Sequence, residues 1–352
     1  MNLEQVEKIA EAVLYEGYML YPYRPSSVKN QQRWNFGVLY PPSWCDAQYS
    51  SDRCSMQTEC LLKTDASTRL TVKVRFLHII QRSIAKLATP STEASASSDL
   101  DLVDRLELNG RVYQPWQEAV ERELSYEGLD PADFCTMEPL LFTFPAGKEV
   151  EYLRDEHGNR AGAVLREWKA LNGSVEIRSL NCHDEVVRVT VQVDNLTESD
   201  AAASFSSATR EETLLHSLVS AHTILGTENG EFLSLLEPPT GFEDSVAQCQ
   251  NLGTWPVLAT DAADAMLSSP IILYDHPQIA PESAGNLFDS TEIDEILSLR
   301  ILTLTEDEKR EMRQSDDRTR GILERTENMP EEQFMKLHGI LRGLKPTKGE
   351  IQ

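Results

Sequence analysis

The stretch Leu70-Thr-Val-Lys-Val-Arg-Phe76 decides the fold, because its side chains alternate between apolar and polar at every step. Successive side chains of a strand point to opposite faces, so this alternation predicts a half-buried β-strand. The run from Val186 to Val193 repeats it, with valines at 187, 189, 191 and 193 separated by Arg188, Thr190 and Gln192. The chain therefore contains strands that bury one face and expose the other.

Turn signals stand between such strand-like runs. Asn-Gly dipeptides occur at Asn109-Gly110, Asn172-Gly173 and Asn229-Gly230. A type I′ hairpin turn needs a positive φ at both central residues, which Asn-Gly tolerates, so we predict a hairpin tip at each, most clearly at Asn172-Gly173. With a further turn at Asp155 to Arg160, these hairpins give an antiparallel succession from about Met56 to Leu236. Two packed sheets are the natural solution for such a succession.

The N-terminus has a different period. Asn2 to about Tyr18 reads as an amphipathic helix with acids and Lys8 off its apolar stripe. The stripe consists of Leu3, Val6, Ile9, Ala10, Val13 and Leu14.

Prolines recur in the chain after Pro238-Pro239. The segment from Trp255 to Glu282 contains Pro256, Pro270, Pro277 and Pro281, which have no N–H to donate. We therefore expect this segment to be no central strand and to be held by its side chains as a wrapping arm. Short helices follow, because Thr305 with Glu308 three residues later is a capping box, and Pro330 suits the first turn of a last helix.

The predicted fold is thus α+β and mostly β. An N-terminal helix and an antiparallel β-sandwich-like core occupy residues 1–240. A proline-rich, irregular and helical C-terminal arm occupies residues 241–352.

Composition limits the function classes. Hydrophobic residues make up 40% and charged residues 26%, which is typical of a globular protein. Lysine and arginine number 33 against 57 acids, and a net charge of −24 repels a phosphate backbone, so we expect no nucleic acid partner. No stretch reaches the roughly 18 apolar residues of a membrane span, and the N-terminus lacks the basic start of a signal peptide. We expect a soluble, cytoplasmic protein without a membrane span.

Aromatic and basic residues interleave in one short segment, which could bind an anion or an acidic loop of another protein. The alternative is that these aromatics close one end of the core while the bases offset nearby acids. The candidate partner-binding residues are Tyr21, Tyr23, Arg24, Lys29, Arg33 and Trp34, together with Trp255 in the arm.

Metal binding has weaker support. Asp275, His276 and Glu282 offer oxygen and imidazole ligands in a short, proline-stiffened stretch, but they match no known ligand spacing. The alternative is that His276 is a polar turn residue.

No catalytic residue is predicted. Cys182-His183 are neighbours in an extended segment, where their side chains point to opposite faces. The common nucleotide-binding, hydrolase and metalloprotease motifs do not occur in the sequence, and we predict no cofactor.

Two long stretches resemble a known family. The first is EAVLYEGY at 11–18 running into LYPYR at 20–24; the second is GTWPVL at 253–258 followed by LSSPIILYDHP at 267–277 and APES at 280–283. They resemble an uncharacterised bacterial family associated with gene clusters for nickel-iron hydrogenases of the high-affinity, oxygen-tolerant type. The resemblance implies a role in making, assembling or supporting that enzyme, and it implies no active-site residue.

Three functional hypotheses follow. The first is a non-catalytic accessory or assembly protein that binds a nickel-iron hydrogenase subunit or its maturation machinery, with a protein as its partner. The second is a metal-dependent enzyme or metal carrier that uses Asp275, His276 and Glu282. The third is a self-assembling structural component.

Overall fold

The computed structural model describes residues 3–16, 21–24, 27, 30, 36–47, 51–91, 100–132, 138–183, 185–198, 208–278, 294–315 and 317–330. The chain divides into two compact units, of which the first comprises Met1–Tyr18 and Gln32–Gln278 and the second Met19–Gln31 and Ile279–Gln352. The first unit thus includes residues 241–278, which the sequence groups with the C-terminal arm.

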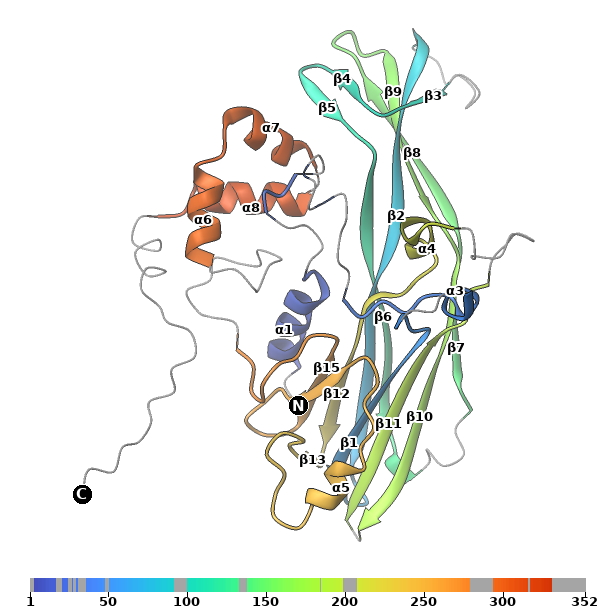
Figure 1. The fold of residues 1–352 in the computed structure, drawn as a ribbon, viewed down its shortest axis with the longest axis vertical. Helices are drawn as coiled ribbons and strands as arrows, with labels where there is room; N and C mark the ends of the chain where they lie inside the picture. Colours follow the sequence, from blue (N-terminus) through green and yellow to red (C-terminus); the bar gives the residue numbers. More distant parts are fainter. Residues whose placement is uncertain are drawn as a thin grey trace. The chain divides into compact units, whose positions relative to one another are not determined.

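The first unit contains two antiparallel sheets (Figure 1). The smaller one has the strand order β13-β1-β11-β10-β7. Its strands are β1 (Ser55–Lys63), β7 (Leu140–Phe144), β10 (Leu171–His183), β11 (Val186–Asn195) and β13 (Glu231–Phe232).

The larger sheet has eight strands organised around β2 (Arg69–Ser91). Its main order is β14-β15-β12-β2-β9-β8, and β3 and β6 also pair with β2. Val74 of β2 pairs with both Thr223 of β12 and Leu124 of β6, so β12 and β6 flank opposite sides of β2. The other strands are β3 (Leu100–Val103), β6 (Trp116–Leu129), β8 (Gly147–Arg154), β9 (Arg160–Trp168), β12 (Val219–Glu228), β14 (Trp255–Leu258) and β15 (Ala265–Ser269).

The core lies between the two sheets. The alternating apolar residues of β2 point into it and are fully buried, and those of β11 meet them from the other sheet. Each large apolar side chain that is fully buried contributes about 1.5 to 3 kcal/mol. These residues are Leu70, Val72, Val74 and Phe76 of β2 and Val187, Val189, Val191 and Val193 of β11. The predicted α+β, mostly β, sandwich-like fold is confirmed.

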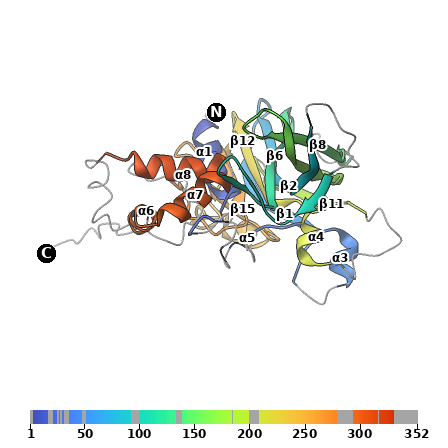
Figure 2. The same cartoon turned by 90° about the horizontal axis from the view of Figure 1, so that it is seen from above.

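The amphipathic N-terminal helix, α1 (Glu4–Leu14), packs on the larger sheet. Val6, Ile9 and Ala10 contact apolar residues of β12 and β15, and Lys73 of β2 forms an ion pair of 2.6 Å with Glu7. The predicted helix and its buried stripe are confirmed. Two shorter helices, α3 (Pro42–Ala47) and α4 (Arg210–Leu214), lie side by side in Figure 2. Arg210 of α4 donates a hydrogen bond of 2.7 Å to the hydroxyl of Tyr40, which precedes α3.

Two of the four predicted hairpins are confirmed. Asn109-Gly110, with φ values of 53° and 72°, links β4 (Leu106–Leu108) to β5 (Arg111–Tyr113). The turn before Arg160 links β8 to β9, and the Asp155 carboxylate accepts hydrogen bonds from the backbone N–H groups of His157 and Asn159.

The hairpin predicted at Asn172-Gly173 is wrong, because both residues lie inside β10. Gly173 pairs with Asn195 of β11 on one side and with Phe142 of β7 on the other. A Cβ at this position would collide with the Phe142 ring and would lie 2.6 Å from the Asp194 carbonyl oxygen. The glycine therefore serves a close approach in the middle of a sheet, not a turn.

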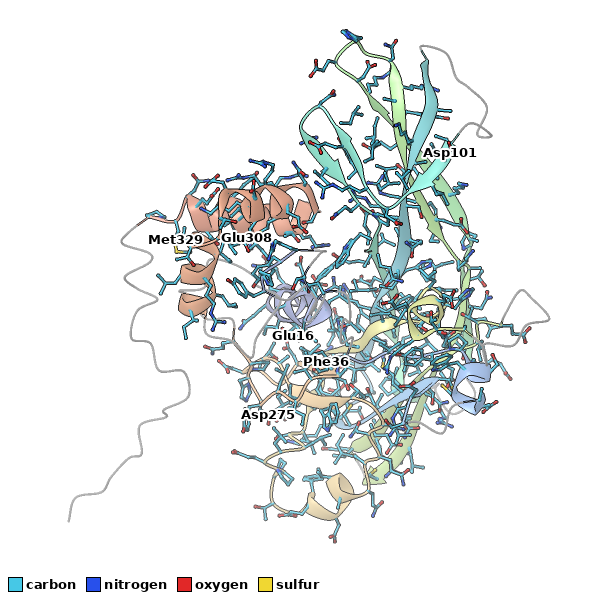
Figure 3. All side chains as sticks on the ribbon, turned by 45° about the horizontal axis from the view of Figure 1, so that its top comes forward. Glu16, Phe36, Asp101, Asp275, Glu308 and Met329 are labelled. Carbon is cyan, nitrogen blue, oxygen red and sulfur yellow. The ribbon has the colours of Figure 1, made fainter. Side chains whose placement is uncertain are left out.

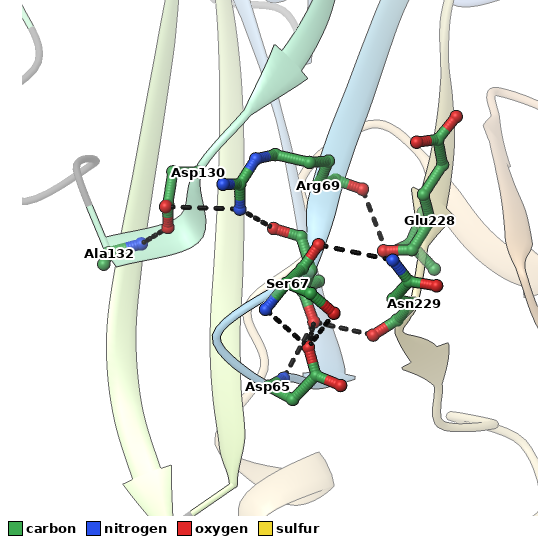
Figure 4. Close-up of polar contacts among 9 residues, drawn as sticks. Asp65, Ser67, Arg69, Asp130, Ala132, Glu228 and Asn229 are labelled. Carbon is green, nitrogen blue, oxygen red and sulfur yellow. Dashed lines mark hydrogen bonds and ion pairs between the residues drawn. The ribbon is translucent and has the colours of Figure 1, made fainter.

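The hairpin predicted at Asn229-Gly230 is also wrong. These residues connect β12 of the larger sheet to β13 of the smaller one, and β13 pairs with β1. The β1-to-β2 connection crosses between the same two sheets, and Figure 4 shows the hydrogen bonds that join the two crossings. Thr68 donates to the Asn229 carbonyl oxygen at 2.7 Å, and the Asp65 carboxylate accepts both the N–H and the hydroxyl of Ser67.

The expectation that the segment after Trp255 is held only by side chains is wrong in part. Its residues 255–258 and 265–269 form β14 and β15, which pair with each other and continue the larger sheet at β12. Pro256 fits because β14 is the edge strand of this sheet.

The second unit contains the helices α6 (Asp294–Leu302), α7 (Glu306–Ser315) and α8 (Asp317–Glu327). The capping box is confirmed at the start of α7, where the Glu308 carboxylate accepts the Thr305 N–H at 2.9 Å and the Thr305 hydroxyl accepts the Glu308 N–H at 3.3 Å; Figure 3 labels Glu308. The helix predicted after Pro330 lies outside the described residues. No helix in the described part of the chain is long and apolar enough to cross a membrane.

Candidate protein-contact surface

Asp275, which Figure 3 labels, lies in the segment that follows β15, and its side chain anchors that segment by hydrogen bonds. One carboxylate oxygen accepts the Leu258 N–H at 2.8 Å, and the other accepts the Ser234 hydroxyl. The next N–H, of His276, donates to the Leu258 carbonyl oxygen at 2.7 Å. The Ser234 oxygen in turn accepts the N–H groups of Leu236 and Glu237. Three chain segments are therefore fixed around one carboxylate.

This anchor closes the outer edge of β14. The Ala259 N–H donates to Ala265, so in the antiparallel ladder the backbone groups of Val257 point toward β15 and those of Pro256 and Leu258 point away. Pro256 has no N–H, and both outward groups of Leu258 bond to Asp275 or His276. The edge strand thus offers no unpaired donor for the addition of another strand.

Exposed apolar side chains lie on the segments that border this closed edge. Residues 270–275 start opposite Trp255, since Ser269 pairs with it, and end at Leu258, so they run beside β14. Leu273 packs inward against the α1 cluster, whereas Ile272 and Tyr274 on either side of it are 70% and 84% exposed. Trp255 is 44% exposed, and Leu236, which follows the anchored Ser234, is 52% exposed. We call Leu236, Trp255, Ile272 and Tyr274 the β14 surface.

The β14 surface has the chemistry of a contact site. Large aromatic and apolar side chains in rigid backbone lose little conformational entropy when a partner covers them, and such residues dominate the energetics of protein interfaces. The predicted contact residue Trp255 belongs to this group. Ile272 and Tyr274 belong to the segment that the sequence predicts to be held by its apolar side chains, and for these two residues that prediction is wrong, because both are exposed.

Four of the other predicted partner-binding residues, Tyr21, Tyr23, Arg24 and Lys29, belong to the second unit. Tyr23 is fully buried, and its ring lies edge-on to that of Tyr21 with centroids 6.2 Å apart. Arg24 forms ion pairs with Glu308 at 3.0 Å and Glu311 at 3.7 Å. These residues therefore pack and pair within the second unit, as the alternative interpretation of the segment expects. Lys29, Arg33 and Trp34 lie outside the described residues.

Asp275 and His276 are used structurally. Both oxygens of the Asp275 carboxylate accept hydrogen bonds from the protein, and the His276 ring lies 3.5 Å from an oxygen of Asp261. Glu282 lies outside the described residues. Within the ranges that the structure describes, no three His, Cys, Asp or Glu side chains are grouped closely enough to hold a metal ion.

Other potentially reactive groups are buried histidines and thiols. Burial lowers the pKa of His222 and of His78 to about 4, so both rings are neutral near pH 7. His222 donates its Nδ1–H to the Ser220 carbonyl oxygen at 2.9 Å, and it pairs with Arg75 of β2. Burial also raises the pKa of Cys249 to about 11, which leaves little thiolate to act as a nucleophile. Cys182 is the last residue but one of β10, which ends at His183, and the side chain of His183 is outside the described set.

The charge distribution around the β14 surface is one-sided. No lysine or arginine occurs between Arg210 and Arg300 in the sequence. Residues 211–278 carry ten acids, which are Glu211, Glu212, Glu228, Glu231, Glu237, Glu243, Asp244, Asp261, Asp264 and Asp275. This run without bases is visible in the sequence, and it is the signal that would have drawn attention to the region around β14.

Comparison with known proteins adds no relative. No protein-family model matches the chain, and no curated protein matches its sequence.

Proposed function

We propose that the protein is a non-catalytic accessory or assembly protein that binds a nickel-iron hydrogenase subunit, or the maturation machinery of that enzyme, through the β14 surface. The supporting observation is the set of exposed apolar side chains held on a closed sheet edge. Ile272 and Tyr274 at 70% and 84% exposure gain the most from a partner that covers them.

The position of the family resemblance supports the same assignment. Two of the stretches that resemble the hydrogenase-associated family, 253–258 and 267–277, form β14, most of β15 and the segment fixed by Asp275. They therefore carry three of the four residues of the β14 surface.

The test is co-purification from cells that express the hydrogenase. The tagged protein is compared with an Ile272→Ser/Tyr274→Ser variant and with a matched control, Leu141→Ser/Leu180→Ser, which removes two leucines that are 77% and 55% exposed on the smaller sheet. Because all four side chains are exposed, both variants should melt within about 2 °C of the wild type.

We expect hydrogenase subunits or maturation proteins to accompany the wild type and the control, and their recovery with the β14 variant to fall at least tenfold. Equal recovery with both variants, or no such protein with the wild type, contradicts the proposal. Two further measurements address the other hypotheses. A stoichiometric transition metal in untagged protein that Asp275→Asn/His276→Asn removes would favour the metal hypothesis, and a large homo-oligomer that Ile272→Ser/Tyr274→Ser dissociates would favour self-assembly.

A further inference from the structure

The β14 surface combines apolar anchors with acids. Glu237 directly follows Leu236 and is held by the Ser234 hydroxyl, and it is exposed. Asp261 lies beside His276 with its side chain 96% exposed. Glu243 and Asp244 are exposed on α5 (Glu243–Ala247), which begins seven residues after Leu236. The apolar side chains and the acids thus lie on segments that Asp275 links, or on segments that adjoin those.

Basic residues approach this region only from its borders in the contacts of the described residues. Arg53 lies next to Gly253, and Arg188 donates to the Gln248 carbonyl oxygen at 3.1 Å. Lys63 pairs with Glu231 at 3.0 Å. The acids Glu237 and Asp261 therefore face solvent next to the apolar side chains without a lysine or arginine partner in those contacts.

The two features together restrict the chemistry of the partner. A purely apolar partner would remove Glu237 and Asp261 from water without compensation, which is unfavourable. An acidic partner would be repelled by both carboxylates and by the net charge of −24. A partner with basic side chains beside apolar ones avoids both the uncompensated burial of the acids and the repulsion. Its ammonium or guanidinium groups also interact well with the faces of Trp255 and Tyr274.

Resting on the proposed function, we infer that the β14 surface binds a basic amphipathic segment of the partner protein, in which apolar and basic side chains lie on one face. Recognition uses side chains and not strand addition, because Pro256 lacks a donor and Asp275 and His276 occupy the outward groups of Leu258. The apolar residues of the segment cover Ile272 and Tyr274, and its basic residues pair with Glu237 and Asp261.

The test uses two synthetic 18-residue amphipathic peptides with the same leucine and tryptophan face. One carries lysine and the other glutamine at the neighbouring positions. Binding to the full-length protein is measured by fluorescence anisotropy at 150 mM salt. The protein variants are Ile272→Ser/Tyr274→Ser, Glu237→Gln/Asp261→Asn and a charge-matched control, Glu149→Gln/Glu156→Gln, which removes two exposed acids on β8 and in the turn after it.

We expect the lysine peptide to bind the wild type at least tenfold more tightly than the glutamine peptide. Glu237→Gln/Asp261→Asn should weaken this binding about threefold or more, Ile272→Ser/Tyr274→Ser at least tenfold, and the control less than twofold. An equal loss in the charge-matched control reveals unspecific attraction to the acidic protein and overturns the inference, as does the absence of binding by either peptide. Equal binding of both peptides overturns the basic partner but leaves the proposed function intact, because co-purification of hydrogenase proteins tests that function independently.

Discussion

The same dipeptide takes opposite roles in two regions of the first unit. Asn109-Gly110 forms a hairpin tip with both φ angles positive, and a Cβ on Gly110 would meet no atom within 4 Å. Asn172-Gly173 lies inside β10, where Asn172 bonds to Thr143 and Thr197 and Gly173 accommodates the Phe142 ring. Asn-Gly permits a turn in both places. Whether it forms one depends on the strand pairing around it, because the buried face of a strand fixes its register.

The largest expected effect is at the glycine inside the sheet. Gly173→Ala places a methyl group against the Phe142 ring and the Asp194 carbonyl oxygen, so we expect the free energy of unfolding to fall by about 3 kcal/mol. Denaturant unfolding measures this change. Gly173→Ala/Phe142→Leu should recover part of the loss, and a loss below about 1 kcal/mol in the single variant would show that the ring position does not require glycine.

His222 extends the comparison to a polar residue, because strand pairing places this histidine in the core. Its pKa is lowered to about 4 by burial, so between pH 6.5 and 4 the unfolded state takes up a proton that the native state does not. The free energy of unfolding should therefore fall by about 2 kcal/mol between pH 7 and pH 5 through this group, at about 1.4 kcal/mol per pKa unit. His222→Gln should remove that part of the decrease. The same pH dependence in the wild type and in His222→Gln would contradict this prediction.

Gly230 is intermediate between the two glycines of the comparison. A Cβ there would lie 2.5 Å from the Thr227 hydroxyl oxygen, 3.0 Å from the Thr68 side chain and 3.1 Å from the Lys63 carbonyl oxygen, at the crossing between the sheets. Since small side chains there can shift, Gly230→Ala should lower the free energy of unfolding by about 1.5 kcal/mol. Thermal melts of Gly230→Ala and Gly173→Ala side by side test this ranking, and a larger loss at Gly230 would reverse it.

The smallest effect is expected at the hairpin tip. Gly110 has a φ of 72° and open space around it, so Gly110→Ala should reduce stability by about 1 kcal/mol through backbone strain alone. Gly110→Asn should retain more stability than Gly110→Ala, because asparagine tolerates this conformation better. If the two variants are equally stable, backbone strain at the hairpin tip is not the cause of the stability loss.

Local patterns in the sequence were sufficient for the elements whose signals do not depend on distant residues. The alternation of Leu70 to Phe76, the stripe of α1 and the capping box at Thr305 and Glu308 all correspond to observed elements. Each rests on the periodicity of one strand or helix or on one turn of backbone. The candidate site was only partly accessible in this way, since Trp255 was selected but Ile272, Tyr274 and Leu236 were not.

The sequence by itself determined a mostly β chain with a buried face on its strands, an amphipathic N-terminal helix and capped C-terminal helices. Only the tertiary structure decided that Gly173 lies under a phenylalanine ring, that Asn229 links two sheets and that Asp275 closes the edge of β14. The physical reason is that periodicity fixes which side of an element is apolar. Which group pairs with each strand edge and each backbone carbonyl is decided instead by contacts between residues far apart in the chain, such as Ser234 and Asp275.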